Sequence, residues 1–213
     1  DARRLVMLDA QVTARGVLRA AEDVAGYYRA RPAVRAELHE LAAVLEDATA
    51  RAGDVYPEAD WPLALHRRYD RFEIIAAVGH RGPGDKISIP QGGILKLEAS
   101  RRELLFVTLD KSGGTFSPTT SYRDRAISRT QFHWETQGGA SVTSAAGRRY
   151  LDSPGNGWRF FLFVQATKGE PYVFLGAASY LAHAGDRPIG ITWALADAMP
   201  AALYDEFALL APG

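Results

Sequence analysis

The hydrophobic pattern of the chain changes its period near Gly79, and this change limits the possible folds more than any other feature. Before residue 52, apolar residues such as Val34, Leu38 and Leu41 recur at the three- and four-residue spacing of a helix. After Gly79, the pattern consists of short runs of β-branched and aromatic residues. We therefore predict an α+β protein in which helices precede a mainly β domain.

Two helices are predicted before residue 52, joined at Arg31-Pro32, because proline is accepted in the first turn of a helix. They form either a structural hairpin or an adaptor that packs on another domain. Gly53–Pro62 has the composition of a linker, and a short amphipathic helix follows it and ends at Gly79. The predicted domains are 1–63, a helical coupler with its linker, and 64–213, the β domain.

Glycine and proline separate the strand-like runs of the second domain, for example at Gly113-Gly114 and Pro154-Gly155. Many short strands with glycine at the corners are typical of a curled, barrel-like sheet. The predicted strands are Ile87–Ile89, Gly93–Leu97, Leu104–Leu109, Phe160–Gln165, Tyr172–Leu175 and Ile189–Leu195.

The composition excludes several classes of site. The chain has no cysteine, which excludes disulfides and thiolate metal sites, and its five histidines lack the spacing of metal ligands. It has no Walker loop, HExxH motif or paired-histidine nuclease motif, so we expect no metal, no cofactor and no catalysis in this chain. No apolar run reaches the length of a membrane span, and we expect a cytoplasmic protein without a membrane partner.

Charge is unevenly distributed along the chain, although the net charge is zero. Residues 67–159 hold 15 Lys and Arg against nine Asp and Glu, whereas residues 1–63 hold eight against 11. A modest basic surface on the second domain is compatible with phosphate contacts, but it is weaker than that of a strongly basic DNA-binding domain. The chain also begins at Asp1 without an initiator methionine, and we expect it to be part of a longer protein.

Five blocks of sequence resemble the C-terminal domain, long of unknown function, of bacterial proteins that carry a superfamily-two helicase motor. The blocks are LHRRYDRFEIIAAVG (65–79), LLFVTLDKS (104–112), FHWETQ (132–137), GRRY (147–150) and YLAHAGDRPIGITWAL (180–195). In many such proteins a phospholipase-D-type nuclease precedes the motor, and members include type IV restriction enzymes that cut modified DNA. The resemblance, over roughly residues 64–203, implies a target-recognition domain with an SRA/PUA-like fold. It also implies upstream helicase and nuclease domains as partners, with residues 1–63 as the coupler.

The stretch Phe116–Gln137 contains the residue types that recognition of a modified base requires. It is too polar for a buried strand and too rich in Phe, Tyr and Trp for an idle loop. To inspect a cytosine, a protein must flip the base out of the duplex, replace its stacking with aromatic faces and satisfy its polar edge. A carboxylate accepts a hydrogen bond from the cytosine amino group, whereas amide and backbone N–H groups donate to the two acceptors of the cytosine edge. These residue types fit what the resemblance implies, a domain similar to the SRA fold that flips a methylated cytosine, and we expect binding to double-stranded DNA that carries 5-methylcytosine or 5-hydroxymethylcytosine.

The predicted base pocket has three kinds of residue. Its aromatic walls are Phe116, Tyr122, Phe132 and Trp134, its carboxylates are Asp124 and Glu135, and its contacts to the base edge or the mark are Ser117, Thr119, Thr120 and Gln137. The residues predicted to contact DNA phosphates are Lys111, Arg123, Arg125, Arg129, His133, Arg148 and Arg187.

Structural alternatives compete with these roles. Phe132 and Trp134 alternate as on one face of a strand, so core packing competes with base stacking. Asp124 lies between two arginines, where it can form a surface ion pair. The segment AHAGDRP (182–188) has the chemistry of a turn in which Asp186 caps its own backbone, with phosphate contact as the functional alternative.

Three other functions stay open. A reader of a phosphorothioate DNA backbone would need a shallow apolar patch with cationic neighbours. A protein-interaction or autoinhibitory domain that docks on the helicase motor would pack residues 116–137 inward. A small hydrolase would need His133 within hydrogen-bond reach of Glu135 or Asp186 in a cleft.

Overall fold

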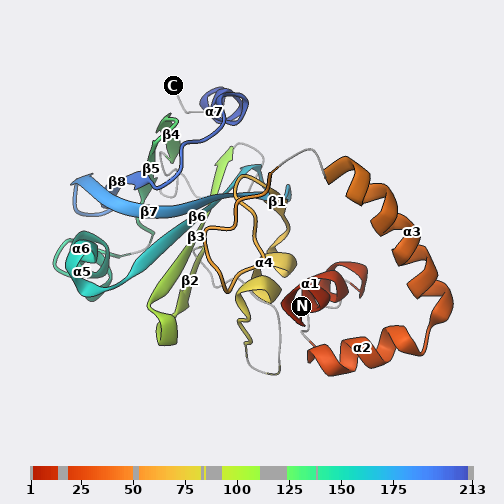
Figure 1. Ribbon diagram of the computed structural model, residues 1–213. Coiled ribbons are helices and arrows are strands. Elements are labelled where there is room, and N and C mark those ends of the chain that lie inside the picture. The colour runs from red at the N-terminus through yellow and green to blue at the C-terminus, as the bar shows by residue number, and fades with distance from the viewer. Residues whose placement is uncertain are drawn as a thin grey trace. The chain divides into compact units, whose positions relative to one another are not determined.

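The computed structural model describes residues 2–13, 19–49, 53–82, 84, 93–110, 124–137 and 139–210 (Figure 1). These residues form two compact units. The first takes in the described residues of Asp1–Leu65 and Arg71–Ser88, and the second those of His66–Asp70 and Ile89–Gly213. None of the described helices is long and apolar enough to cross a membrane.

The first unit is helical, with α1 (Ala2–Thr13), α2 (Ala21–Arg29), α3 (Pro32–Thr49) and α4 (Arg71–Val78). As predicted, α2 and α3 join at Arg31-Pro32, and proline is the first residue of α3. The prediction of one helix before Arg31 is wrong, because α1 and α2 are separate helices.

The buried carboxylate of Asp9 in α1 explains the separation of these two helices. Asp9 is 1% exposed, and it accepts two hydrogen bonds from the guanidinium of Arg19. In one continuous helix, residues ten apart would be separated by about 15 Å along the axis. The Asp9–Arg19 ion pair therefore requires the chain to turn between them.

The second unit is built on one sheet. Its strands are β1 (Arg68–Tyr69), β2 (Ile94–Leu97), β3 (Arg102–Asp110), β4 (Arg125–Ser128), β5 (Gln131–Glu135), β6 (Arg159–Thr167), β7 (Tyr172–Ala184) and β8 (Gly190–Leu195). Its helices are the 3-10 helix η2 (Glu98–Ser100) and the α-helices α5 (Ala145–Leu151), α6 (Ser153–Asn156) and α7 (Ala201–Ala208).

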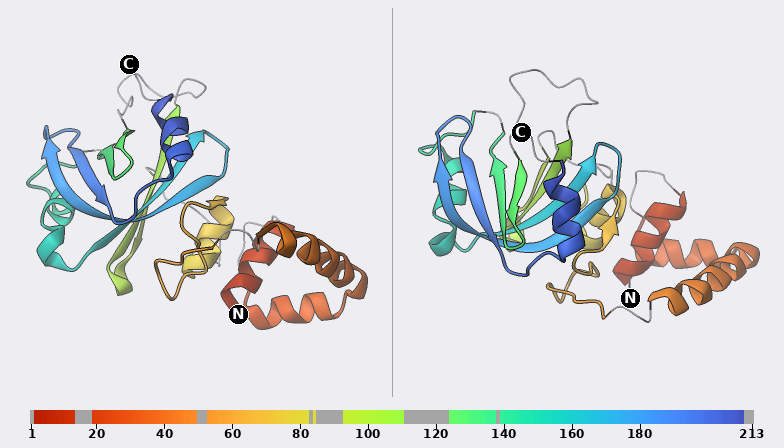
Figure 2. Two further views of the ribbon diagram at one scale, coloured as in Figure 1. Left: turned by 45° about the horizontal axis from the view of Figure 1, so that its top comes forward. Right: turned by 90° about the horizontal axis from the view of Figure 1, so that it is seen from above.

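The strand order is β2-β3-β6-β7-β8-β5-β4, with β1 paired to β7 (Figure 2). The β3–β6 pair is parallel, and the other pairs are antiparallel. These elements confirm the α+β prediction. Within the described residues no pairing joins the edge strands β2 and β4, so the sheet is open. The predicted strand Ile87–Ile89 lies outside the described residues.

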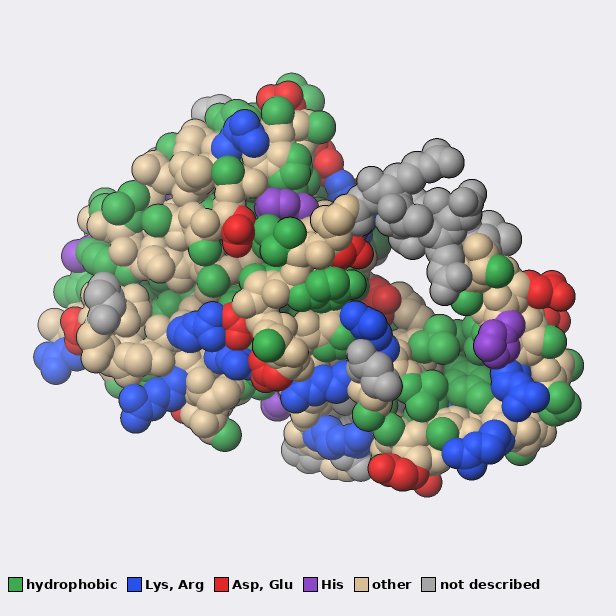
Figure 3. All heavy atoms as spheres, viewed as in Figure 1, with side chains coloured by type: hydrophobic (Ala, Val, Ile, Leu, Met, Phe, Trp, Pro, Cys, Tyr) green, Lys and Arg blue, Asp and Glu red, His purple; other side chains and the backbone are tan. Residues whose placement is uncertain are grey.

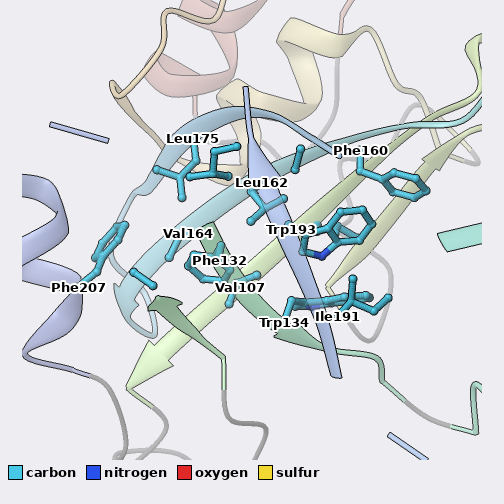
Figure 4. Close-up of a cluster of buried hydrophobic side chains, with 14 of the residues drawn as sticks. Val107, Phe132, Trp134, Phe160, Leu162, Val164, Leu175, Ile191, Trp193 and Phe207 are labelled. Carbon is cyan, nitrogen blue, oxygen red and sulfur yellow. The ribbon is translucent and has the colours of Figure 1, made fainter. Parts of the chain in front are cut away.

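Alternation along the strands separates two faces of this sheet. Side chains from β3 to β8, together with Tyr150 of α5 and Phe207 of α7, form one core on the first face (Figure 4). We call this the core face. On the opposite, outer face, Phe163 stacks on Phe106 and Phe174, with ring centroids 5.3 and 4.7 Å apart. Phe106, Phe163 and Phe174 are also buried, so both faces are covered in the middle of the sheet. Burying large apolar side chains stabilises each by about 1.5–3 kcal/mol.

Candidate functional site

Three of the sequence blocks meet at Ile189, where β8 begins. The FHWETQ block reaches it through Thr136, whose N–H donates to the Ile189 carbonyl and whose Oγ1 accepts from the Ile189 N–H, both at 2.9 Å. The GRRY block reaches it through Gly147, where a Cβ would lie 3.1 Å from Ile189 Cδ1. The same Cβ would lie 2.0 Å from the Ser141 carbonyl oxygen, so this contact between α5 and its neighbours requires glycine. We call this region the hairpin end, because it lies at the β7–β8 turn.

The β7–β8 turn is fastened to the loop before α5. Asp186 Oδ1 accepts from the backbone N–H of Val142 at 2.8 Å. The predicted turn is present. The carboxylate of Asp186 bonds to the loop before α5, where the prediction had it capping its own backbone. Ser144 then caps α5 by accepting from the N–H of Gly147 at 3.1 Å. Together these bonds bring the exposed side chains of Arg148 and Arg187 to the same end of the sheet.

His133 lies on the outer face of β5 at this end. Its ring covers Gly190 so closely that a Cβ there would be 2.8 Å from His133 Cε1. Burial lowers the pKa of His133 below its ordinary value, and the charge of Arg125 lowers it further, while Glu135 and Asp124 oppose the shift. The lowered pKa favours the neutral form of His133. In that form it can donate a hydrogen bond to a phosphate, but it cannot neutralise one.

The distance from His133 Nε2 to Glu135 Oε1 is 3.9 Å. This is an ion-pair distance and is longer than a hydrogen bond. The carboxylate of Asp186, the other partner that the hydrolase alternative requires, accepts from Val142. His133 and Glu135 are thus in ion-pair contact on the outer face of β5, and the Asp186 carboxylate serves the backbone of the loop before α5.

Asp124 holds the start of β4 on the end of β5. It is 4% exposed, and its Oδ1 accepts from the backbone N–H of Glu135 at 2.9 Å. The carboxylate is therefore buried and does not lie on the surface. One of the oxygens that was predicted to meet a cytosine amino group is occupied by this backbone bond.

Two predicted walls of the base pocket lie in the core. Phe132 is 0% and Trp134 is 1% exposed, and both point to the core face (Figure 4). The core-packing alternative is therefore confirmed for these two rings. Glu135 and Gln137 are half-buried, the former on the outer face and the latter beyond the end of β5.

Arg129 is held by the segment before α7. Its Nε donates to the Met199 carbonyl at 2.6 Å, and the N–H of Met199 donates back to the Arg129 carbonyl at 2.8 Å. A phosphate contact by Arg129 would compete with the first of these bonds. Arg125 is half-buried beside His133.

The remaining predicted site residues, Lys111, Phe116, Ser117, Thr119, Thr120, Tyr122 and Arg123, lie outside the described residues. The described residues that flank them belong to distant strands. Asp110 ends β3, next to β6, and Asp124 precedes β4 at the opposite edge of the sheet.

A buried polar network was missed by the sequence reasoning. Glu103 is 0% exposed on the core face of β3 and accepts from the hydroxyl of Tyr150 and from Nε of Arg149, both at 2.6 Å. Burial raises the pKa of the Tyr150 hydroxyl, and the Glu103 carboxylate raises it further. The signal was the position of Glu103, two residues before Leu105 in an alternating strand, where a core residue is expected.

No group of three or more His, Asp or Glu residues in the described part of the chain could hold a metal ion. On the face drawn in Figure 3, Lys and Arg side chains lie among acidic and apolar ones and do not form a continuous basic surface.

Comparison with known families assigns most of the chain to one family. A family model described as a domain of unknown function (DUF3427) matches residues 63–207. The chain belongs to the DUF3427 family. No curated protein matches it. The DUF3427 region includes the hairpin end, the Glu103 network and every predicted site residue.

Proposed function

We propose that this DUF3427 domain recognises modified DNA and that it acts as the target-recognition part of an ATP-dependent type IV restriction enzyme. The marks we propose are 5-methylcytosine and 5-hydroxymethylcytosine, read by base flipping. The supporting observation is the convergence of the FHWETQ, GRRY and YLAHAGDRPIGITWAL blocks at Ile189, where Thr136 and Gly147 contact a residue 53 and 42 positions away in sequence. Loops held on a rigid sheet are the usual carriers of binding residues.

The charges at the hairpin end are consistent with DNA backbone contacts. Arg148 and Arg187 are exposed there, and Arg125 lies on the adjacent outer face. Arginine contacts to phosphates position a protein on the duplex without reading its sequence. Three such contacts give a slope of log affinity against log salt of about −2.7. Specificity for the mark must therefore come from groups that meet the base itself.

The same proposal includes an SRA/PUA-like fold and partner domains in the parent protein. The open, twisted sheet (Figure 2) supports an SRA/PUA-like arrangement, in which loops at one end of the sheet would meet the DNA. We propose that helicase and nuclease domains precede this region in the parent protein and supply the chemistry, with residues 1–63 as the coupler. In this proposal the chain itself is not an enzyme, and it acts in the cytoplasm at the nucleoid.

The test is a binding titration of the 213-residue chain at fixed physiological salt. The probes are matched duplexes that are unmodified or carry 5-methylcytosine, 5-hydroxymethylcytosine or a phosphorothioate linkage. Preference for either modified cytosine supports the proposal. Equal binding to all four duplexes, or no binding, refutes it and favours a domain that docks on its own motor.

A phosphorothioate reader is the second candidate. Leu181, which is 50% exposed, lies near the hairpin end with the exposed pair Arg187-Pro188 beyond it. An apolar surface beside a cation suits a phosphate in which sulfur replaces one oxygen. Preference for the phosphorothioate duplex alone would favour this function over base reading.

A further inference from the structure

The core face of the second unit carries two adjacent rows of side chains that cross β5, β8 and β7. In one row, Trp193 of β8 lies opposite Phe132 of β5 and Tyr180 of β7. In the next row, Ile191 lies opposite Trp134 and His183. Side chains directly opposite each other on one face of a sheet are in contact range. Each row therefore runs from the buried centre of the core to the end of β7.

Trp193 lies in an aromatic environment. Its ring centroid is 4.9 Å from that of Phe160, 6.3 Å from that of Tyr150 and 6.4 Å from that of Trp134 (Figure 4). Such rings present flat apolar faces of the kind on which nucleobases stack. Tyr150 is held in this group by its hydrogen bond to Glu103.

The indole N–H of Trp193 is the unusual feature of this group. Trp193 is 0% exposed, and its Nε1–H has no hydrogen-bond acceptor among the residues that the structure describes. A buried donor without an acceptor destabilises a fold, and buried tryptophans usually find a partner for this group. A phenylalanine would provide an aromatic ring without this cost. The indole N–H is therefore suited to an acceptor that a ligand brings.

Tyr180 and His183 lie between Trp193 and solvent. Tyr180 is half-buried against the core, and its hydroxyl is 2.7 Å from Nδ1 of His183, which is exposed. In the described pairings, β6 meets β7 only as far as Ala178, so both residues lie on the part of β7 beyond β6. Tyr180 lies directly opposite Trp193, and a side-chain rotation of Tyr180 breaks no backbone hydrogen bond of the sheet.

We infer that Trp193 is the floor of a base-binding site on the core face, and that the Tyr180–His183 pair is its gate. When Tyr180 moves aside, a planar base turned out of the duplex stacks on the indole ring. The Trp193 N–H donates to an acceptor on the edge of that base, and cytosine provides two acceptors. This inference rests on the proposed function. It places the base beside the rings of Phe132 and Trp134, which lie in the core.

The first test is Trp193→Phe, which keeps an aromatic ring and removes the N–H. Two quantities are measured: the free energy of unfolding, and the affinities for the preferred modified duplex and for its unmodified match. We expect the affinity for the modified duplex to fall about tenfold, as for loss of one buried hydrogen bond. The affinity for the unmodified duplex should not decrease, whereas the stability should fall because the smaller ring leaves a void beside Phe160 and Tyr150.

The matched control is Trp61→Phe. Trp61 is 2% exposed and belongs to the first unit, so this change tests a buried tryptophan of the other unit. It should leave both affinities unchanged.

A second variant keeps the inference testable if Trp193→Phe does not fold. Tyr180→Phe retains the ring and removes the hydroxyl that bonds to His183. Opening the gate then costs less free energy, and a site that binds only when open gains apparent affinity. We expect the modified duplex to bind a few times more tightly to this variant, with the unmodified duplex unchanged.

The outcomes separate the two proposals. If the wild-type chain prefers a modified duplex and both variants keep the same preference, Trp193 is only a core residue and this inference fails alone. If Trp193→Phe lowers stability without altering the preference, the indole serves only the core packing and the inference also fails. If the wild-type chain has no preference, the proposed function fails and this inference fails with it.

Discussion

Replacing Glu103 with Gln tests whether the buried network of the second unit stabilises the fold as its geometry indicates. Glu103 is 0% exposed and accepts from Arg149 Nε and Tyr150 at 2.6 Å each, with Arg149 Nη2 at 3.5 Å. Glutamine has the same shape, but it loses the charge and turns an N–H₂ group toward groups that only donate here.

The magnitude follows from the burial of the two partners. Breaking a buried ion pair by removing one charge costs about 3–5 kcal/mol, because the other charge stays uncompensated. The side chain of Arg149 is 16% exposed, so its guanidinium regains some water. We therefore expect the lower end of this range, about 3 kcal/mol. For a chain of this size that loss lowers Tm by roughly 6–12 °C.

The assay is urea unfolding followed by tryptophan fluorescence, since Tyr150 contacts Trp134 and Trp193. Glu98→Gln is the matched control, because Glu98 is 68% exposed and pairs with Lys96 at 3.1 Å on the surface. That variant should change the stability by less than about 1 kcal/mol. A loss below about 1 kcal/mol in Glu103→Gln would show that the carboxylate is solvated, and the reasoning would be refuted.

Three further predictions concern the hairpin end. The folded pKa of His133 is below its ordinary value of 6.5, so the unfolded chain binds a proton first as pH falls. The free energy of unfolding therefore decreases below about pH 6.5. In urea unfolding series from pH 7.5 to 5.5, His133→Asn should reduce the slope of the unfolding free energy against pH. Gly147→Ala should destabilise the domain by about 2–3 kcal/mol, measured by urea unfolding, because its Cβ would overlap the Ser141 carbonyl. Arg148→Gln and Arg187→Gln should each reduce the salt slope of DNA binding by about 1 in titrations at several salt concentrations.

Each of these predictions has a contradicting outcome. An unchanged acid slope in the His133 variant would assign the pH dependence to other groups, such as His66, whose pKa burial also lowers. Gly155→Ala is the control for Gly147, because nothing lies within 4 Å of a Cβ there, and equal losses would contradict the contact argument. Arg35→Gln, an exposed change in α3, should leave the salt slope unchanged. If it reduces the slope as much as Arg148→Gln does, the hairpin end is not the DNA surface.

The surroundings of the predicted site residues were less evident from the sequence than the elements that carry them. The strand alternation of FHWETQ placed Phe132 and Trp134 on one face, but alternation does not say which face the fold buries. The core face is buried because β3, β6 and β8 contribute residues such as Leu105, Leu162 and Ile191 to the same layer. Glu103 was overlooked because its partners Arg149 and Tyr150 lie 46 and 47 residues away in sequence.

Local sequence alone determined the classes of element and most of their places. The start of α3 at Pro32, the helix α4 and five of the strands follow from residue spacing, proline and glycine, because these act within a few residues of the chain. Tertiary structure decided what no local pattern contains. The parallel pairing of β3 with β6, the turn between Asp9 and Arg19, and the bond from Asp186 to Val142 join distant segments, and their free energy depends on surfaces that exist only after the chain has folded.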